Sequence, residues 1–299
     1  MNHPQKILVI GGANIDIKGR ADDALTLYTS NPGVVWRSPG GVGRNIAQSL
    51  ATVGTSVALM TALGSDVDGT WLREDLEKAG VDTSPTIMLS RFRTGTYLAV
   101  VDVRGELIAA VSDMSIMTAL TPTLIRQTIS DIKDISMICV DTNLTPDSLT
   151  AVVESAKEQG IRVVCEPVSV VKAKRMMGLL SGLFAITPNQ DELAHLSGMP
   201  VSSFEDVVAA SRRLTDAGTS IVVTTRGASG SVVVTAADVW ELAAVKVRPV
   251  DVTGAGDAFT AGFVSGLVRG LAADAAAKYG HELAAKVVAS DQSVLSADV

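Results

Sequence analysis

The stretch DVTGAGDAF, residues 251–259, places an aspartate directly after three small residues and before an apolar run that predicts a helix. The unpaired N–H groups of Gly254, Ala255 and Gly256 would lie at the positive end of the helix dipole, an arrangement that binds anions such as phosphate. Such an anion would repel the carboxylate of Asp257, unless that carboxylate accepts a proton from an attacking hydroxyl. From the pattern alone, capping of the helix explains Asp257 equally well.

A second glycine cluster, SPGGVGRNIAQSLATVG at residues 38–54, leads into another predicted helix. Gly41 and Gly43 allow the main chain to approach a ligand closely, although a plain turn would use the same residues. A Walker A loop needs Lys and then Ser or Thr after its last glycine, and Arg44 and Asn45 stand there instead. The segment GGANID also lacks the third glycine of a dinucleotide-binding fingerprint. The cluster therefore predicts close ligand approach without a P-loop.

Asn189 and Glu192 lie three residues apart at the start of a predicted helix, in TPNQDELAHLSG. The two side chains share one face of that helix, and an amide oxygen together with a carboxylate suits a hydrated Mg²⁺ ion. A capping box, in which each side chain bonds the other residue's backbone N–H, accounts for the same spacing. The sequence leaves both interpretations open.

A strand, a glycine-rich turn and a second strand are predicted in VVTTRGASGSVVV. This arrangement would place Thr225, Gly227 and Gly230 at the edge of a nucleotide site. An ordinary β-turn is the simpler explanation of the same residues, and without other observations it is preferred.

An α/β architecture must hold these motifs. From about residue 120, short β-branched runs alternate with helical stretches, which is typical of a parallel sheet covered by helices. Several runs have almost no polar alternation, as expected of strands that are buried on both faces. Thr145 followed by Pro146 marks the start of one helix, which ends at Gly160. The predicted strands are KILVI, SVALMTAL, SMICVD, IRVVCE, LFAITP and SIVVTT.

Residues 13–38 and 94–113 instead predict extended, partly polar strands, with a hairpin turn at Arg104 and Gly105. We expect them to pair as a small sheet outside the main one. Such a sheet is a natural lid over a site at the carboxyl ends of parallel strands, although an ordinary edge extension fits the pattern as well. No repeat or linker divides the sequence, so we expect residues 1–299 to form a single domain with this lid.

The composition excludes several classes of function. Of the 299 residues, 47% are hydrophobic, enough for a large core, and the formal net charge of −7 leaves no excess of Lys and Arg to follow a nucleic-acid backbone. No apolar run approaches the length of about 20 residues that spans a bilayer, and MNHPQKILVI lacks a signal-peptide core. We expect a cytoplasmic protein that binds neither nucleic acid nor membrane, with Cys139 and Cys165 reduced and buried in strands.

Together the motifs resemble those of the PfkB, or ribokinase-like, family of carbohydrate and nucleoside kinases. The family's C-terminal signature is matched by the whole of DVTGAGDAFTAGFV, and the order and spacing of the motifs agree over essentially the whole chain. The resemblance implies a central, mainly parallel sheet flanked by helices, a β-sheet lid over the sugar, and ATP-dependent phosphorylation of a sugar or nucleoside hydroxyl. The N-terminal signature is matched by Gly40, Gly41, Gly43, Asn45, Ala47, Gly54 and Gly64.

The resemblance also implies a role for each motif. Asp257 would accept the proton of the acceptor hydroxyl, while the N–H groups of residues 254–256 stabilise the phosphoryl group in transfer. Asn189 and Glu192 would organise Mg²⁺ and its waters around the phosphates. The residues that border ATP would be Asn189, Thr225, Gly227, Gly230, Gly254 and Gly256.

Sugar and cation contacts follow from the same resemblance. Asp16 matches a position that contacts sugar hydroxyls in the family. Asp251 and Thr253 match positions at which many members bind K⁺, although the other half of such a site is not recognisable in KVVASDQSVLSADV, so that K⁺ dependence stays open. The other expected contacts to the sugar or base are Asn14, Asn31, Gly41, Gly43, Asn45 and Tyr97.

Within the family, the N-terminal third is most similar to the pseudouridine kinases, in GGANIDIKG, SNPG and PGGVGRNIAQ, followed by SDM and EPVS. Glu166 departs from the Asp that we expect before this proline. The similarity implies transfer of the γ-phosphoryl group of ATP to the 5′-hydroxyl of the nucleoside. The exposed edges of the lid strands predict a homodimer. Other acceptors (ribose, adenosine or a ketose) and a non-catalytic sensor on the same fold are the alternatives.

Overall fold

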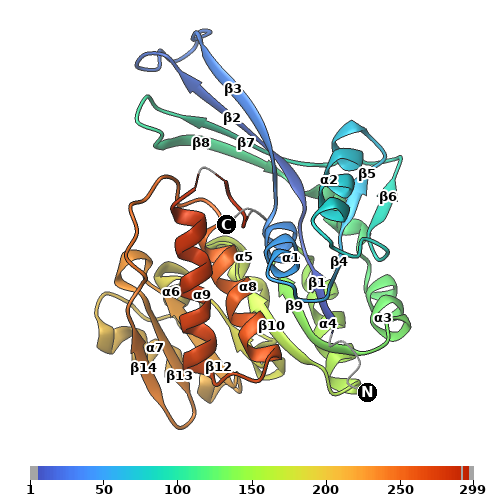
Figure 1. The fold of residues 1–299 in the computed structure, drawn as a ribbon, viewed down its shortest axis with the longest axis vertical. Helices are drawn as coiled ribbons and strands as arrows, with labels where there is room; N and C mark the ends of the chain where they lie inside the picture. Colours follow the sequence, from blue (N-terminus) through green and yellow to red (C-terminus); the bar gives the residue numbers. More distant parts are fainter. Residues whose placement is uncertain (1–5, 291, 296–299) are drawn as a thin grey trace.

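The computed structural model describes residues 6–290 and 292–295. Its main sheet has eight strands in the order β14-β13-β12-β11-β10-β9-β1-β4, with helices on both faces (Figure 1). The six strands from β4 across to β12 run parallel, and β13 pairs antiparallel with both β12 and β14, which confirms the expected mainly parallel sheet. The strands are β1 (Lys6–Ile10), β4 (Val57–Met60), β9 (Ile135–Asp141), β10 (Arg162–Glu166), β11 (Ala185–Ile186), β12 (Ile221–Thr225), β13 (Ser231–Thr235) and β14 (Val239–Leu242).

Each predicted strand run is found in the structure, with one difference. The run SVALMTAL divides at Thr61: β4 belongs to the main sheet, whereas β5 (Ala62–Gly64) pairs with β6 (Ile87–Leu89) as a separate two-stranded sheet. Both β4 and β5 are fully buried. The hydrophobic pattern therefore does not show where the chain leaves the main sheet.

Two layers of helices cover the main sheet, and the residues of β1 alternate between them. Leu8 and Ile10 join the core cluster formed with α3, α4, α6 and α7, whereas Ile7 and Val9 join the cluster formed with α1, α8 and α9. Within the described part of the chain, none of the helices is long and apolar enough to cross a membrane. The helices are α1 (Val42–Thr52), α2 (Val67–Lys78), α3 (Pro122–Asp131), α4 (Pro146–Glu158), α5 (Val170–Ala173), α6 (Gln190–Ser197), α7 (Phe204–Asp216), α8 (Ala255–Val268) and α9 (Ala273–Val288).

The two cysteines are buried and free, as the sequence predicts. Cys139 on β9 belongs to the core cluster on one face of the main sheet, and Cys165 on β10 belongs to the cluster on the other face. The sheet itself therefore separates the two thiols.

A second sheet projects from the main one (Figure 1). It has four strands in the order β3-β2-β7-β8, drawn from the two segments that the sequence predicts as extended. The β7–β8 hairpin turns where predicted, because the Asp102 carboxylate accepts the N–H groups of Arg104 and Glu106, both at 2.8 Å, and Gly105 has a φ of 86°. The strands are β2 (Asn14–Ala21), β3 (Gly33–Gly40), β7 (Gly95–Val101) and β8 (Leu107–Asp113).

Candidate active site

The first turns of α1 and α8 meet where the second sheet joins the main one. Asn45, in the first turn of α1, donates from Nδ2 to Oδ2 of Asp257, in the first turn of α8, at 2.7 Å. On β2, Asn14 donates from Nδ2 to Oδ1 of Asp16, also at 2.7 Å. The fold thus brings together four side chains that the sequence predicts as site residues.

Asp257 is half-buried, and burial is the main reason that its pKa rises from 3.8 to about 7. The charges of Asp141 and Asp16 raise this pKa further, while the hydrogen bond from Asn45 and the charge of Arg44 lower it. Among the residues that the structure describes, Asn45 is the one hydrogen-bond partner of the Asp257 carboxylate, so the carboxylate does not cap α8. A carboxylate that exchanges its proton near neutral pH suits the role of general base.

The start of α8 has the geometry of an anion site. Gly254 is the N-cap with a φ of 79°, and a side chain at this position would clash with the carbonyl oxygen of Ser293. Gly256 is exposed in the first turn, where N–H groups have no acceptor within the helix. The N–H of Ala255 makes a long hydrogen bond of 3.2 Å to the carbonyl of Val252. An anion can therefore approach this helix end without obstruction by side chains.

The glycine-rich loop before α1 packs directly against the segment after β1. A Cβ at Gly41, which has a φ of 100°, would lie 2.6 Å from the Cα of Ala13. A Cβ at Gly43 would lie 2.7 Å from the Cα of Gly11. These positions require glycine because two main-chain segments of the protein touch there. The predicted close approach of a ligand to these glycines stays a prediction.

Asp141, at the carboxyl end of β9, ties the same two segments together. Its Oδ2 accepts the N–H groups of Gly12 at 2.8 Å and Gly43 at 2.9 Å, and its Oδ1 accepts the N–H of Asn143 at 2.8 Å. The carboxyl group is buried, and burial raises its pKa. The motifs of the sequence do not include this residue, although an acidic side chain at the carboxyl end of a buried parallel strand is a signal for a site at that edge of the sheet.

A row of polar residues crosses one face of the second sheet. Asp16 pairs with Ser38 on β3 and with Tyr97 on β7, and Tyr97 pairs with Ser112 on β8. Directly paired residues lie on the same face of a sheet. Asp16 and Ser38 line one cavity and Ser112 lines a second, so this face of the sheet covers the site. Burial raises the pKa of Asp16.

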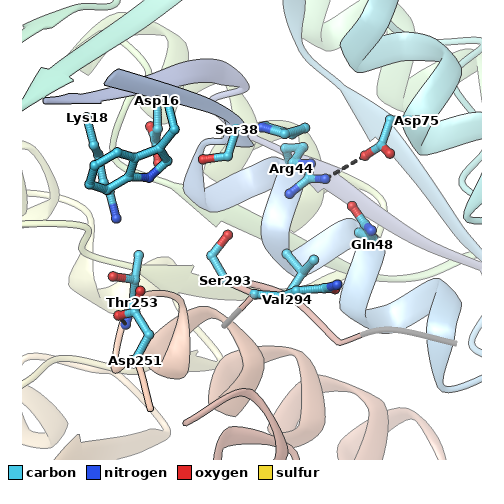
Figure 2. Close-up of a pocket in the computed structure, with 13 residues that line it drawn as sticks. Asp16, Lys18, Ser38, Arg44, Gln48, Asp75, Asp251, Thr253, Ser293 and Val294 are labelled. Carbon is cyan, nitrogen blue, oxygen red and sulfur yellow. Dashed lines mark hydrogen bonds and ion pairs between the residues drawn. The ribbon is translucent and has the colours of Figure 1, made fainter. Parts of the chain in front are cut away.

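The first cavity, of about 290 Å³, lies between the second sheet and the loop before α8 (Figure 2). Lys18 borders it from the sheet, and Asp251, Thr253 and Ser293 border it from the opposite side. Burial raises the pKa of Asp251, but hydrogen bonds from Thr253 and the charge of Lys18 outweigh burial and bring it below its ordinary value. Part of KVVASDQSVLSADV, where the other half of a K⁺ site was sought, lies outside the described residues.

The motifs expected on the nucleotide side meet at the end of β12. Asn189 and Thr225 form a β-bridge, and the turn between β12 and β13 contains Gly227 and Gly230, both with positive φ. Asn189 and Glu192 form a capping box, in which each side chain accepts the other residue's backbone N–H at 2.9 Å. The capping interpretation of this spacing is confirmed, and the remaining carboxylate oxygen of Glu192 is not used by the box.

Glu166, at the end of β10, is a buried carboxylate beside this motif. It accepts hydrogen bonds from the hydroxyls of Thr187 at 2.7 Å and Thr260 at 2.8 Å. Burial, and then the charge of Glu192, raise the pKa of Glu166 well above its ordinary value. A divalent cation would offset the repulsion between these two carboxylates, so their arrangement fits such an ion.

The second cavity, of about 340 Å³, opens at the Ser112 end of the polar row. Lys172 and Asn143 line it, and Lys172 donates from Nζ to Oδ1 of Asn143 at 2.6 Å. The amide nitrogen of Asn143 therefore points away from Lys172, and a Cβ at Gly12 would lie 2.8 Å from it. The cavity thus presents N–H donors directly beside Gly12.

Asn31, which was expected to contact the sugar or base, lies away from Asp257 and forms hydrogen bonds with its neighbours in the β2–β3 connection. Its Oδ1 accepts the N–H of Thr26 at 2.9 Å, and its Nδ2 donates to the carbonyls of Thr26 and Thr29. These contacts fasten the β2–β3 connection, which lies at the far tip of the second sheet (Figure 1). Tyr97, in contrast, lies in the polar row beside Asp16.

Comparison with known proteins identifies relatives that cover nearly the whole chain. A family model described as pfkB family carbohydrate kinase matches residues 4–298. The chain is 33% identical to the pseudouridine kinase of Escherichia coli strain K12, over 91% of this chain and 86% of the relative. It is 30% identical to the guanosine-inosine kinase of Exiguobacterium acetylicum, over 97% and 96% of the two chains. The ribokinase of Thermotoga maritima shares the fold, with a TM-score of 0.86 and 24% identity over 98% and 96% of the two chains.

The family match and the site geometry agree on the class of chemistry. A helix end open to an anion stands next to a carboxylate with a raised pKa, as phosphoryl transfer to a hydroxyl requires. The relatives from Escherichia coli and Exiguobacterium acetylicum are both kinases. A ribokinase of the same fold from Arabidopsis thaliana has been solved with ribose and ATP. The chain belongs to the pfkB family of carbohydrate kinases and is a phosphotransferase with an alcohol group as acceptor.

Proposed function

We propose that the protein phosphorylates the 5′-hydroxyl of pseudouridine with ATP as donor, giving pseudouridine 5′-phosphate and ADP. The observation that carries this proposal is Asp257, a half-buried carboxylate with a pKa of about 7 in the first turn of α8. A hydroxyl held between Asp16 and Asp257 would meet a base and an anion-binding helix end at once.

The proposed mechanism depends on positioning and charge stabilisation, because the transition state of phosphoryl transfer is loose. The acceptor oxygen forms a bond to the γ-phosphorus, the bond from that phosphorus to the β,γ-bridging oxygen breaks, and ADP leaves. Asp257 accepts the proton of the acceptor, while the N–H groups of residues 254–256 stabilise the transferred group. The second sheet acts as a lid that excludes water and so prevents hydrolysis of ATP.

Two cations belong to the proposal. Asn189 and Glu192 would hold Mg²⁺ through its waters, and the buried carboxyl group of Glu166, whose pKa is raised in part by the charge of Glu192, supports a cation there. This ion would offset the negative charge of the phosphates. Asp251 stays ionised because its pKa is lowered, which supports the proposed K⁺ contact at Asp251 and Thr253.

The second cavity supports a nucleoside over a free pentose as the acceptor. Lys172 and Asn143 supply N–H donors for carbonyl oxygens of a base, and the hydroxyls of Ser112, Thr118 and Thr145 in the same cavity can accept from its N–H groups. A pyrimidine with two carbonyl groups matches this set, because Lys172 and Asn143 provide a donor for each carbonyl. The similarity to a pseudouridine kinase points to the same acceptor.

A homodimer joined through the lid is the last part of the proposal. The second sheet exposes apolar side chains, and pairing of two copies would cover them together with the unpaired strand edges. ATP as donor and two free cysteines fit a cytoplasmic enzyme. The exposed fractions of these side chains are Val34 53%, Val35 70%, Leu107 59%, Ile108 50% and Val111 67%.

A competition assay tests the proposed acceptor. The purified protein receives MgATP, with and without K⁺, and an equimolar mixture of pseudouridine, uridine, adenosine, guanosine, inosine and ribose, and the products are quantified by mass spectrometry. We expect pseudouridine phosphate to exceed every other product by about tenfold or more, because unpaired polar groups penalise the wrong base. A different main product would reject pseudouridine as the acceptor, and binding without phosphorylation would favour a sensor.

A further inference from the structure

The network around Asp257 contains a buried arginine. The side chain of Arg44, in the first turn of α1, is 3% exposed, and arginine is rarely buried unless it is paired. Its Nη2 lies 2.6 Å from Oδ2 of Asp75 on α2 (Figure 2), and its Nη1 donates to Oδ1 of Asn45 at 3.0 Å. Because Asn45 donates to Asp257, a chain of four side chains runs from α2 to the proposed base.

The guanidinium decides which way the amide of Asn45 points. An asparagine side chain offers an oxygen on one side and a nitrogen on the other, whereas a guanidinium offers donors alone. With Arg44 donating to the oxygen, the nitrogen must face Asp257. The reversed amide would set the N–H groups of Asn45 and Arg44 against each other, and the oxygen of Asn45 against a carboxylate.

The same guanidinium opposes the negative groups around Asp257. The charges of Asp141 on β9 and Asp16 on β2 raise the pKa of Asp257, and the charge of Arg44 lowers it. A buried Arg–Asp pair is by itself a weak source of stability, because desolvation of both ions offsets their attraction. Stability alone therefore does not explain why Arg44 and Asp75 are paired in the interior, whereas the hydrogen bond from Arg44 to Asn45 gives the pair a role.

We propose that Arg44 is a positioning residue for phosphoryl transfer: held by Asp75, it orients the Asn45 amide so that Oδ2 of Asp257 stays bonded and Oδ1 faces the acceptor hydroxyl. This proposal rests on the proposed role of Asp257 as the base. Arg44 acts through Asn45 and does not touch the reacting atoms. Its removal also takes away the positive charge that lowers the pKa of Asp257, so that this pKa rises.

Kinetics of Arg44→Met, measured with the acceptor that the wild type phosphorylates fastest, give the first test. We expect kcat to fall about 10- to 100-fold, a large part of what general-base help supplies, with less than about a twofold change in KM for the acceptor. The acid limb of kcat/KM against pH should move up by about one unit. Arg44→Lys keeps the charge and should return this limb toward the wild-type position. Arg73→Met, which removes an arginine paired with Glu77 at 3.7 Å on the surface of α2, should change neither quantity.

A titration of Asp257, which needs no enzymatic turnover, tests the role of Arg44 independently of the proposed function. The carboxyl carbons of aspartate are followed by ¹³C NMR in the unliganded protein, and the Asp257 signal is assigned by its loss in Asp257→Asn. We expect a higher pKa in Arg44→Met than in the wild type or in Arg73→Met. If the wild type phosphorylates no acceptor, the proposed function fails and the titration still decides the role of Arg44.

Two results would overturn the proposal. The first is a folded Arg44→Met protein with wild-type kcat and an unchanged Asp257 titration. The second is a loss confined to KM, which would make Arg44 a binding residue. If Arg44→Met does not fold, Asp75→Asn provides the test. This variant keeps an acceptor for Arg44 but removes the negative charge that neutralises the guanidinium, so the pKa of Asp257 should fall. An unchanged pKa of Asp257 contradicts the proposal.

Discussion

Asp257 meets two requirements that oppose each other. A base that works near neutral pH needs a raised pKa, and burial beside Asp141 and Asp16 provides it. The same surroundings make the ionised carboxylate costly in the folded protein, because the unfolded chain exposes this group to water. The hydrogen bond from Asn45 offsets part of this cost. The proposed base therefore lowers the stability of the protein in a pH-dependent way.

Asp257→Asn should consequently stabilise the protein, and more so at pH 8 than at pH 5. The folded-state pKa of about 7 lies above the unfolded value near 3.9, so the wild type loses stability as pH rises from about 4 to 7, whereas the amide does not titrate. The shift corresponds to at most about 4 kcal/mol, and partial exposure of the group reduces the expected difference between the two pH values to about 1–2 kcal/mol. Urea unfolding of both proteins measures it. A difference that does not depend on pH would contradict the raised pKa.

Residue types indicate the chemistry of this site, but the partners of those residues emerge on folding. DVTGAGD predicts an anion site next to a carboxylate that is either a base or a helix cap, while the contact of Asp257 with Asn45 spans 212 positions of sequence. The position of Asp141 at the end of a buried strand is visible in the sequence, but its hydrogen bonds from the N–H groups of Gly12 and Gly43 leave no pattern there. The spacing of Asn189 and Glu192 fits two roles, and the structure shows one of them directly, the capping box.

Among the helices and strands, α8 shows how packing in the core fixes the position of the first turn of a helix. Ten consecutive residues, 258–267, are buried, which fixes the helix within the core. Its backbone approaches α9 closely: a Cβ at Gly262 would lie 2.8 Å from the Cα of Gly280. The first turn is thereby held at the edge of the main sheet. The apolar run in the sequence predicts this helix, but the crossing with α9 depends on backbone contact that hydrophobicity does not encode.

The two ends of α8 allow a matched pair of substitutions. Gly254 and Gly270 have φ values of 79° and 84°, but a side chain at Gly254 would clash with Ser293, whereas nothing lies within 4 Å of a Cβ at Gly270. Both alanine variants should lose about 1 kcal/mol from backbone strain, and Gly254→Ala should lose more because its Cβ would clash with the carbonyl oxygen of Ser293. Gly254→Ala should in addition lower kcat by about tenfold or more, because displaced N–H groups no longer meet the phosphoryl group. Thermal unfolding and steady-state kinetics measure both effects, and equal activities of the two variants would contradict the role of this helix end.

At the scale of the molecule, the site depends on two sheets whose partner strands are far apart in the sequence. β2 and β7 pair in parallel although about 80 residues separate them, and their pairing creates the polar row that faces the site. The sequence predicts the two extended segments and their association, since their partial polarity differs from the buried strands of the main sheet. The register that aligns Asp16 with Tyr97 and Ser112 is a property of the folded sheet.

The proposed dimer predicts the behaviour of surface variants on the second sheet. Val111→Lys places a charge on an exposed apolar strand, and light scattering should show dissociation of a wild-type dimer of about 62 kDa, twice the chain mass of 31.0 kDa. Val67→Lys, which alters a valine of similar exposure on α2, should leave the dimer intact. A wild-type protein that is monomeric at working concentration would contradict the proposed assembly.

We propose that this chain transfers a phosphoryl group to the 5′-hydroxyl of pseudouridine with Asp257 as the base. The most direct measurement is ³¹P NMR of the products formed from pseudouridine and MgATP by the wild type and by Asp257→Asn. We predict a phosphomonoester whose phosphorus couples to both 5′ protons, formed by the variant at about 1% of the wild-type rate or less, with nucleoside and ATP still bound. Phosphorylation of another hydroxyl, hydrolysis of ATP without an ester, or near-normal turnover by the variant would contradict the claim.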